Sequence, residues 1–172
     1  MQHLYIVVPL AIFIILGLLY LMFGKMRYAG LIFLNLPYAL SGGILFLLVR
    51  GLYLSISASI GFVALFGVAV LNGIVLIEHL NHTKEKISDL RRAVVEGTAD
   101  RLRPVLMTAL VASFGFIPMA FNTGPGSEVQ RPLATVVIGG LFTSTLATLM
   151  LLPVVYYIVE KRKRINTEKE NN

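Results

Sequence analysis

Cysteine and tryptophan are absent, and charged residues make up only 14% of the 172-residue sequence. Without cysteine, the chain has no disulfide, no thiolate ligand for a metal and no thiol redox motif. Soluble domains carry charge on about a quarter of their residues. Here 56% of the residues are hydrophobic, which together with the scarcity of charge indicates an integral membrane protein.

Basic residues outnumber acidic ones and give a formal net charge of +6. A basic chain could bind nucleic acid, but these lysines and arginines stand between or after long apolar segments. Such placement is typical of loops that set the orientation of membrane helices. We therefore expect a lipid bilayer around this chain, and no nucleic-acid partner.

Five segments are long and apolar enough to cross a bilayer, whose ~30 Å hydrocarbon core needs roughly 20 residues. They comprise residues 4–23, 31–49, 57–80, 104–121 and 136–159. The first does not resemble a signal peptide, because no Lys or Arg precedes it, its apolar run is too long and no small-residue cleavage site follows it. The predicted fold is an all-α, five-span transmembrane domain over residues 1–160.

Basic residues collect on one side of the membrane in this topology. Thirteen fall there: Lys25, Arg27, Lys84, Lys86, Arg91, Arg92, Arg101, Arg103, Lys161, Arg162, Lys163, Arg164 and Lys169. The opposite side receives only Arg50 and Arg131. Because cytoplasmic loops carry the excess of Lys and Arg, the loop over 81–103 and the C-terminal tail are predicted to be cytoplasmic and the N-terminus periplasmic.

Two cytoplasmic segments have their own patterns. Residues 83–96 repeat apolar side chains at helical spacing among charged ones, which predicts an amphipathic helix on the membrane surface. Gly97 is the expected stop of this helix, and Thr98 the expected N-cap of the next one. The tail over 161–172 is basic and polar, and we expect it to be disordered.

Small residues mark the expected contact faces of the spans, since membrane helices associate through close packing. The candidates are Gly67, Ala69, Gly73, Gly139, Gly140, Thr143 and Ser144. A polar turn interrupts the apolar sequence between the fourth and fifth spans, with Gly124, Pro125 and Gly126 as the reversal. Glu128 and Arg131 follow it, and an exposed pair of this kind would contribute only about 0–1 kcal/mol.

Three polar residues within or beside the spans are functional candidates. Asn72 lies near the middle of the third span, where an amide must face protein or water. It forms either an interhelical hydrogen bond or part of a proton-responsive network. Arg101 and Thr108 are seven residues apart, so they lie along one helix face. In one interpretation, Arg101 is a positive charge that anchors the span at the cytoplasmic side and Thr108 bonds its own helix. In the other, the Arg101 guanidinium and the Thr108 hydroxyl take part in a proton relay.

The residues that could bind a metal do not form a recognised metal-binding motif. Glu78, His79 and His82 stand close together, but their order and spacing differ from the zinc-protease helix motif. The methionines are not clustered in sequence, so packing explains them better than binding of a soft monovalent ion. We expect no metal site and no cofactor in this chain.

Several long motifs carry a family resemblance. They are GFVALFGVAVLNGIVLI, RLRPVLMTALVASFGFIPMA and TGPGSEVQRPLATVVIGGL, supported by VVPLAIFIILGLLYLMFG and NLPYALSGGILFLL. Together they closely resemble the C-terminal membrane half of resistance–nodulation–division (RND) efflux pumps, best the heavy-metal branch of cobalt–zinc–cadmium exporters. The resemblance implies a trimeric pump with twelve membrane helices and two periplasmic domains. This chain would correspond to helices eight to twelve.

The resemblance also implies roles for single residues. Arg101 and Thr108 match positions of the proton pathway in the multidrug branch, and Asn72 matches an asparagine beside it. Leu71 stands where that branch has lysine and some monovalent-metal exporters have glutamate. Val105 stands where some copper and silver exporters have lysine. These departures favour divalent cations as the substrate of the parent system.

The sequence therefore predicts a secondary transporter component of the bacterial inner membrane, not an enzyme. Its expected partners are the rest of the pump, with helices one to seven and the periplasmic domains, a periplasmic adaptor and an outer-membrane channel. We expect the chain not to transport alone, because the acidic proton carriers of the family belong to a helix outside it. Two alternatives stay open: an inert or interaction-only fragment, and a small stand-alone oligomeric transporter.

Overall fold

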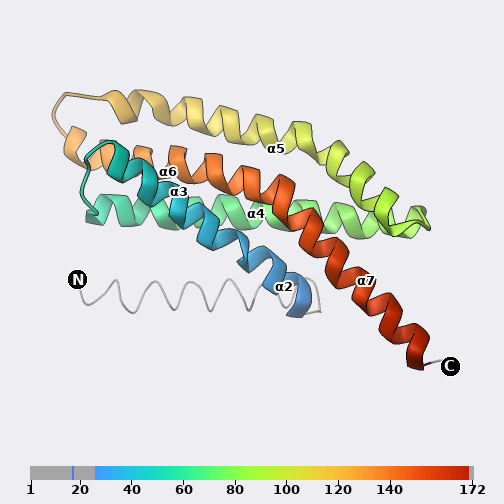
Figure 1. The fold of residues 1–172 in the computed structure, drawn as a ribbon. Coiled ribbons are helices and arrows are strands. Elements are labelled where there is room, and N and C mark those ends of the chain that lie inside the picture. Colours follow the sequence, from blue (N-terminus) through green and yellow to red (C-terminus); the bar gives the residue numbers. More distant parts are fainter. Residues whose placement is uncertain (1–16, 18–25, 171–172) are drawn as a thin grey trace.

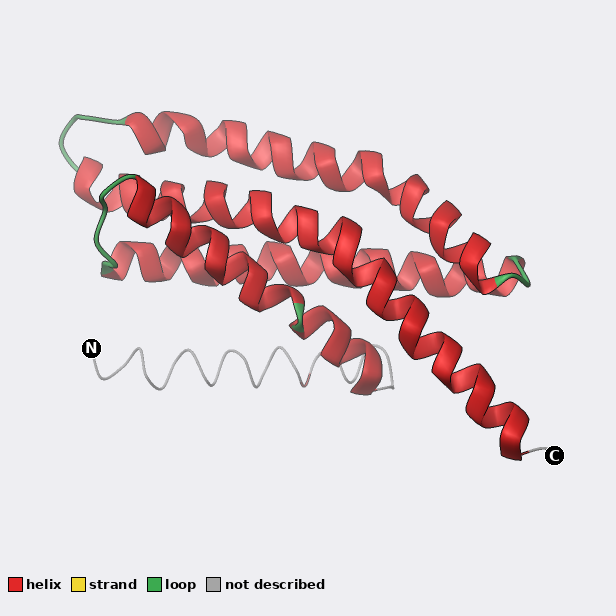
Figure 2. Cartoon of the chain, viewed as in Figure 1, coloured by secondary structure: helices red, strands yellow, loops and turns green. Residues whose placement is uncertain are grey.

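Helices make up every regular element that the structure, a computed structural model, describes. It describes residue 17 and residues 26–170, with side chains described over residues 28–163. The helices are α2 (Met26–Phe33), α3 (Asn35–Val49), α4 (Ile56–Lys86), α5 (Leu90–Phe121), α6 (Ser127–Leu146), the π-helix η1 (Ala147–Leu151) and α7 (Leu152–Glu170). Figure 2 shows that only short loops separate them within this part of the chain. The predicted all-α class is confirmed.

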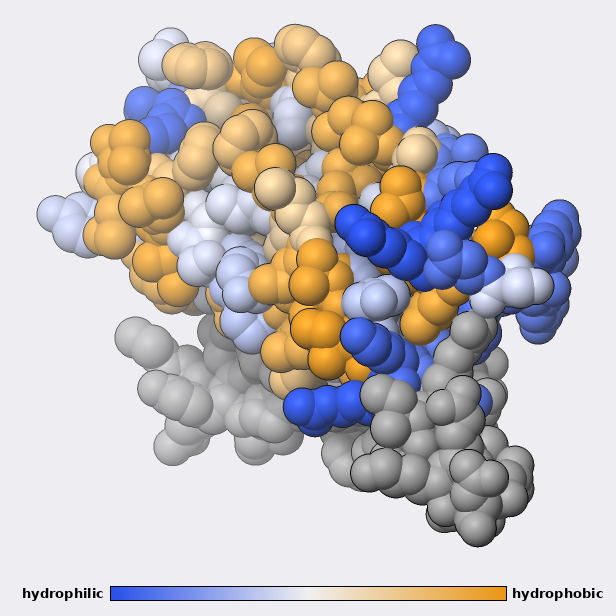
Figure 3. All heavy atoms as spheres, turned by 45° about the vertical axis from the view of Figure 1, so that its right-hand side comes forward, coloured by the Kyte–Doolittle hydropathy of each residue, from blue (hydrophilic) through white to orange (hydrophobic). Residues whose placement is uncertain are grey.

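The long helices run alternately up and down a bundle with two distinct ends. The loops at 50–55 and 122–126 lie together at one end, which we call the turn end (Figure 1). The loop at 87–89 and the last residues of α7 lie toward the opposite end, which we call the basic end. Figure 3 shows hydrophilic side chains gathered toward the basic end and hydrophobic ones over much of the rest of the visible face. This alternation is the one that the distribution of charge predicts.

Four helical stretches in the described part of the chain are long and apolar enough to cross a membrane. They are Tyr28–Val49, Ile56–Lys86, Leu90–Phe121 and Ser127–Lys163. Each of these stretches contains the whole of one predicted span, namely those over 31–49, 57–80, 104–121 and 136–159. The first predicted span, 4–23, lies outside the described residues except for Gly17.

The predicted amphipathic helix over 83–96 is wrong. α4 continues to Lys86, the chain breaks helical geometry at residues 87–89, and α5 runs unbroken from Leu90 into the fourth span. Asp89 is the N-cap, since its Oδ1 accepts a hydrogen bond from the backbone N–H of Arg91 at 3.0 Å. The apolar residues on both sides of this break therefore belong to the ends of two long packed helices.

Gly97 and Thr98 consequently do not mark a helix boundary. A Cβ at Gly97 would lie 3.0 Å from Leu80 and 3.2 Å from the hydroxyl of Thr83, so the glycine lets α5 pack closely on α4. Thr98 donates its hydroxyl proton to the carbonyl of Val94 at 2.7 Å, which is a bond within a helix rather than a cap.

The expectation of a disordered tail is also wrong for residues 161–170, which continue α7 as far as Glu170. No glycine or proline follows Pro153, and lysine, arginine and glutamate are good helix formers. Because propagation of an existing helix is far easier than its nucleation, the packed part of α7 can extend into this polar sequence.

Small residues bring α3, α4 and α6 into close contact. A Cβ at Gly139 of α6 would lie 2.8 Å from the carbonyl oxygen of Gly42 in α3, and one at Gly140 would lie 2.9 Å from that of Ala39. The hydroxyl of Thr143 donates to the carbonyl of Tyr38 across the same contact at 2.9 Å. Membrane helices lack a hydrophobic driving force for association, so such backbone proximity is a main source of their stability.

The remaining predicted packing residues divide into two groups. Ala69, Gly73 and Ser144 are buried, and Gly73 packs against Ile32 of α2. Gly67 is exposed, and a Cβ there would meet nothing within 4 Å, so its assignment to a helix contact is wrong within the described chain. The reason is geometric, because residue 67 lies about 200° around the helix from residue 69 at about 100° per residue.

Gly139→Ala is expected to destabilise the bundle by about 1–3 kcal/mol, the usual cost of overpacking. The new Cβ would lie 2.4 Å from the Phe46 ring and 2.8 Å from backbone that cannot rotate away. The measurement is unfolding of the purified chain in mixed micelles, followed by circular dichroism at increasing fractions of sodium dodecyl sulfate.

Gly67→Ala is the matched control, since it makes the same chemical change on an open helix face. It should leave stability unchanged or raise it by up to about 1 kcal/mol through helix propensity. Equal losses in the two variants would contradict the close approach of α3 and α6.

Candidate functional site

Asn72 lies in α4 with only 7% of its surface exposed. Its side-chain Nδ2 is buried and has no hydrogen-bond partner in the described residues. The interhelical hydrogen bond that was one alternative for this residue is therefore not donated by Nδ2 within this part of the chain. A buried amide without a partner costs about 1–3 kcal/mol, so a group from outside these residues would be favoured there.

Arg101 and Thr108 lie two turns apart on α5. Thr108 is exposed, and its hydroxyl donates to the carbonyl of Pro104 on its own helix at 2.9 Å. Arg101 is half-buried, and its Nε has no hydrogen-bond partner within the described chain. Among the described residues, no hydrogen bond connects Arg101, Thr108 and Asn72, so the structure does not join them into a network.

α5 exposes a continuous apolar face around Thr108. We define the open face of α5 as Pro104, Met107, Thr108, Val111 and Phe114, whose spacing places them on one side of the helix. Only 17% of the most apolar stretch of α5 is buried, against 50% for α4 and 61% for α6 to α7. The bundle thus surrounds α6 and leaves α5 at its edge.

A polar contact that the sequence did not reveal lies at the centre of the bundle. Asn35 is 2% exposed, and its Nδ2 lies 2.5 Å from the hydroxyl of Thr148 and 3.5 Å from the carbonyl oxygen of Ala69. Its Oδ1 has no partner among the described residues. This amide joins α3 to α4 and to η1. The clue to it in the sequence is a lone asparagine inside the apolar span over 31–49.

Thr148 lies in the π-helix η1, which precedes Pro153. Proline has no N–H to donate to the carbonyl four residues earlier, so the regular α-helical hydrogen-bond pattern cannot pass through this point. Isolated π-helical turns occur often at functional sites. Here the turn presents the Thr148 hydroxyl, which is fully buried, to Asn35.

A buried charge network ties the helices together at the basic end. Glu160 of α7 is 4% exposed and pairs with Lys84 of α4. The hydroxyl of Tyr28 lies 3.4 Å from the same carboxylate, and the Tyr28 and Tyr156 rings stack with their centroids 6.0 Å apart. Glu160 lies just beyond the fifth predicted span, and through these contacts it bridges α2, α4 and α7.

Arg50 has the corresponding role at the turn end. Its guanidinium donates to the hydroxyl of Thr135 in α6 and to the carbonyl of Ala120 in α5, both at 2.8 Å. It also lies 5.1 Å from the centre of the Phe121 ring. This arginine therefore satisfies the end of α5 while holding α3, α5 and α6 together.

The polar turn folds as a compact reversal into α6. Gly126 has φ of +83°, a left-handed conformation that glycine adopts without strain, and the N–H of Ser127 donates to the carbonyl of Gly124. Asn122 accepts from the N–H of Gly124 at 2.9 Å. No ion pair joins Glu128 to Arg131 in the described part of the chain, so the pairing considered for them is not formed there.

The two histidines of α4 have separate acidic neighbours. His79 Nε2 lies 3.5 Å from Asp100 of α5, and His82 Nδ1 lies 3.8 Å from Glu85 of its own helix. Within the residues that the structure describes, no group of three or more His, Asp or Glu side chains converges as metal ligands do.

Comparison with known proteins gives consistent results. A sequence model described as the AcrB/AcrD/AcrF family matches residues 1–160. The chain is 52% identical over 160 residues to the cobalt-zinc-cadmium resistance protein CzcA of Cupriavidus metallidurans, covering 93% of this chain and 15% of that protein. It is 56% identical over 169 residues to protein HelA of Legionella pneumophila, covering 98% of this chain and 16% of that protein.

A solved structure agrees in fold as well as in sequence. The crystal structure of a heavy metal efflux pump superimposes with a TM-score of 0.82 at 48% identity, over 93% of this chain and 16% of that one. The chain thus spans about one sixth of the length of the proteins it matches.

Lys84→Met is expected to destabilise the bundle by about 3 kcal/mol, because it leaves the buried Glu160 carboxylate without its main partner. Adding Glu160→Gln should restore most of the loss, since the double variant no longer buries an uncompensated charge. Unfolding in mixed micelles gives both values. Arg92→Met, which removes an exposed pair with Glu96, should have little effect, and a loss equal to that of Lys84→Met would contradict this account.

Proposed function

The chain belongs to the AcrB/AcrD/AcrF family, in the heavy-metal branch of RND transporters, and from this membership we propose that it forms helices eight to twelve of a proton-driven pump that exports divalent cations. The family resemblance inferred from the sequence is confirmed by the match over residues 1–160 and by relatives more than 50% identical. Transport by the whole pump, its substrate and its location in the bacterial inner membrane are parts of the proposal.

One observation supports this proposal most strongly. Polar groups in the sequence motifs shared with RND pumps have no partner within the described bundle. Asn72 Nδ2 and Arg101 Nε are buried and unpaired in the described residues, and Thr108 is exposed on a helix of which little is buried. We assign Arg101 and Thr108 to the proton pathway and Asn72 to a position beside it. Their missing partners would then be side chains of the remaining membrane helices.

The open face of α5 is accordingly assigned to contact with the rest of the pump. An apolar helix face could also face lipid, but this face carries the exposed Thr108 hydroxyl, which bonds only its own helix and for which hydrocarbon offers no further partner. A neighbouring helix with acidic side chains would satisfy both the charge of Arg101 and the proton-transfer chemistry. The trimer, the periplasmic adaptor and the outer-membrane channel follow from the family resemblance alone.

Divalent cations are proposed because two positions lack the ionisable residues found in relatives with other substrates. Leu71 is 57% exposed on α4, and Val105 is 4% exposed on α5. Neither side chain can change charge or bind a metal. The name of the Cupriavidus metallidurans relative refers to cobalt, zinc and cadmium, which makes these ions the appropriate test substrates.

Thr108→Val is expected to reduce metal export roughly tenfold or more, since positioned proton-transfer groups typically contribute about 10²–10⁴-fold. The experiment uses a chimera in which this chain replaces the matching segment of the Cupriavidus metallidurans relative. Zinc, cobalt and cadmium tolerance and efflux from vesicles under an imposed pH gradient are measured. Arg101→Ala should cause a similar loss.

Thr108→Ser retains the hydroxyl and should keep most of the activity, whereas Glu128→Ala should change little, since it alters an exposed side chain outside the assigned pathway. The assignment is wrong if Thr108→Val exports metal as well as Thr108→Ser, at equal protein abundance in the membrane.

The 172-residue chain by itself is expected not to perform proton-coupled efflux. Coupling needs a group that changes charge within the membrane, and the central parts of the predicted spans contain no Asp, Glu, Lys or Arg. Asn72 and Thr108 do not store a proton at ordinary pH. Gradient-dependent zinc efflux by vesicles containing only the purified chain would support a small independent transporter instead.

A further inference from the structure

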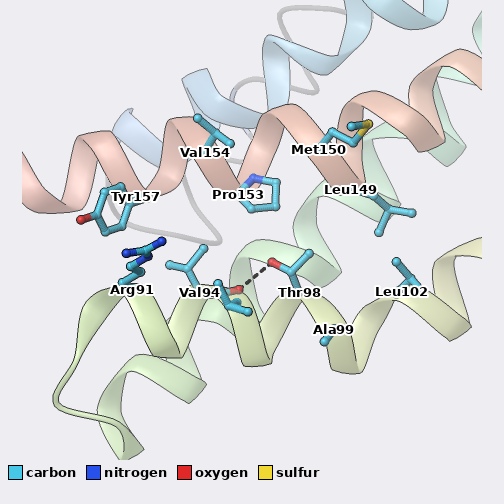
Figure 4. Close-up of a pocket in the computed structure, with 11 residues that line it drawn as sticks. Arg91, Val94, Thr98, Ala99, Leu102, Leu149, Met150, Pro153, Val154 and Tyr157 are labelled. Carbon is cyan, nitrogen blue, oxygen red and sulfur yellow. Dashed lines mark hydrogen bonds between the residues drawn. The ribbon is translucent and has the colours of Figure 1, made fainter.

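A groove lies between the first half of α5 and the junction of η1 with α7 (Figure 4). Its volume is about 620 Å³, within the range of about 300–1,000 Å³ typical of small-molecule sites. Its walls include Val95, Ala99 and Leu102 on one side and Met150, Pro153 and Val154 on the other.

The groove is accessible from outside and apolar along its length. Val95, Leu102, Met150 and Val154 are each at least 47% exposed. The lining contains two hydroxyls, one of which belongs to Tyr157 at one end of the groove. The other, that of Thr98, donates to the carbonyl of Val94 at 2.7 Å, a bond that Figure 4 shows as a dashed line. The lining therefore suits a flexible hydrocarbon rather than a polar ligand.

Basic side chains stand at one end of this apolar groove. Arg91 lines it beside Tyr157, and Lys161 lies with its Nζ 5.9 Å from the centre of the Tyr157 ring. Neither Arg91 nor Lys161 forms an ion pair among the described residues, whereas the nearby acids Glu96 and Glu160 are paired with Arg92 and Lys84. The mouth of the groove thus presents two positive charges available to an anion.

The groove and the residues assigned to the proton pathway lie on different sides of α5. At about 100° per residue, the groove residues of α5 point roughly 100° away from Arg101 and Thr108. A neighbouring helix that covers the open face of α5 would therefore leave the groove accessible from the bilayer.

We propose that this groove binds an anionic phospholipid, with one acyl chain between α5 and α7 and the phosphate held by Arg91 and Lys161. The dimensions match, because Leu102 lies eleven residues beyond Arg91, about 16 Å along the helix, which an acyl chain reaches from its headgroup. Basic pockets between membrane helices bind lipid headgroups through the same combination of apolar contact and charge.

The absence of tryptophan provides a direct probe. Leu102→Trp introduces a single indole into the groove, and its fluorescence is quenched by lipids with brominated acyl chains. The full chain is placed in bilayers in which brominated phosphatidylglycerol or brominated phosphatidylcholine is mixed with unlabelled phosphatidylcholine. Quenching then gives the relative affinity of the groove for the anionic lipid. Phe114→Trp, on the open face, is the control reporter.

We expect the Leu102→Trp reporter to prefer phosphatidylglycerol over phosphatidylcholine by about 5- to 25-fold, since each of the two basic residues contributes up to roughly fivefold. The preference should fall to that of the Phe114→Trp control when Arg91→Gln and Lys161→Gln are combined. Lys86→Gln with Arg162→Gln removes the same charge from the basic end, from side chains outside the groove lining, and should leave the preference intact.

Three results would overturn the proposal. One is equal quenching by the two lipids at Leu102→Trp, and another is an equal loss of preference in the two double variants. The third is a reporter that no brominated lipid quenches, which would indicate that another copy of the chain covers the groove. Circular dichroism of each variant confirms that the comparison is made between folded proteins.

Discussion

The close approach of α3 and α6 at Gly42, Gly139 and Gly140 is the constraint on which the bundle depends. Carbonyl oxygens of α3 lie only 2.8–2.9 Å from where a Cβ at Gly139 or Gly140 would be, so glycine is the residue that permits this spacing without a shift of the backbone. Burial of apolar surface drives little association inside a bilayer, and packing must therefore bring the helices together. Once α6 is surrounded, Asn35 at the start of α3 reaches η1, and Arg50 just after α3 reaches α5 and α6. α5 is left at the edge.

The apolar runs and the placement of basic residues predicted the helical class and the alternation of the spans. The prediction was wrong where glycine can have either of two structural roles, ending a helix or allowing close helix packing. Gly97 was predicted to end a helix, but it allows α5 to pack on α4. Long-range polar contacts could not be predicted at all. Lys84 and Glu160 are 76 residues apart, and nothing in their spacing indicates that they meet.

The candidate proton-pathway residues show a different limit of sequence reasoning. Arg101, Thr108 and Asn72 were singled out by their chemistry and by the family motifs, but the described residues do not join them. Their unpaired atoms and the open face of α5 are explained together if other helices of an RND pump complete the site. The bundle then acts as a rigid support, tied at its two ends by Arg50 and Glu160, for one side of a coupling site.

The absence of cysteine allows the central claim, that other helices cover the open face of α5, to be tested by a single label. Thr108→Cys and, as a control in the groove, Met150→Cys are each reacted with a membrane-soluble maleimide. Both sites are exposed in this chain and should react when it is present alone. When the remainder of a related pump is co-expressed, the account predicts protection of Thr108→Cys while Met150→Cys stays reactive. Equal labelling of Thr108→Cys with and without the remainder, in an assembly shown to form by co-purification, would contradict it.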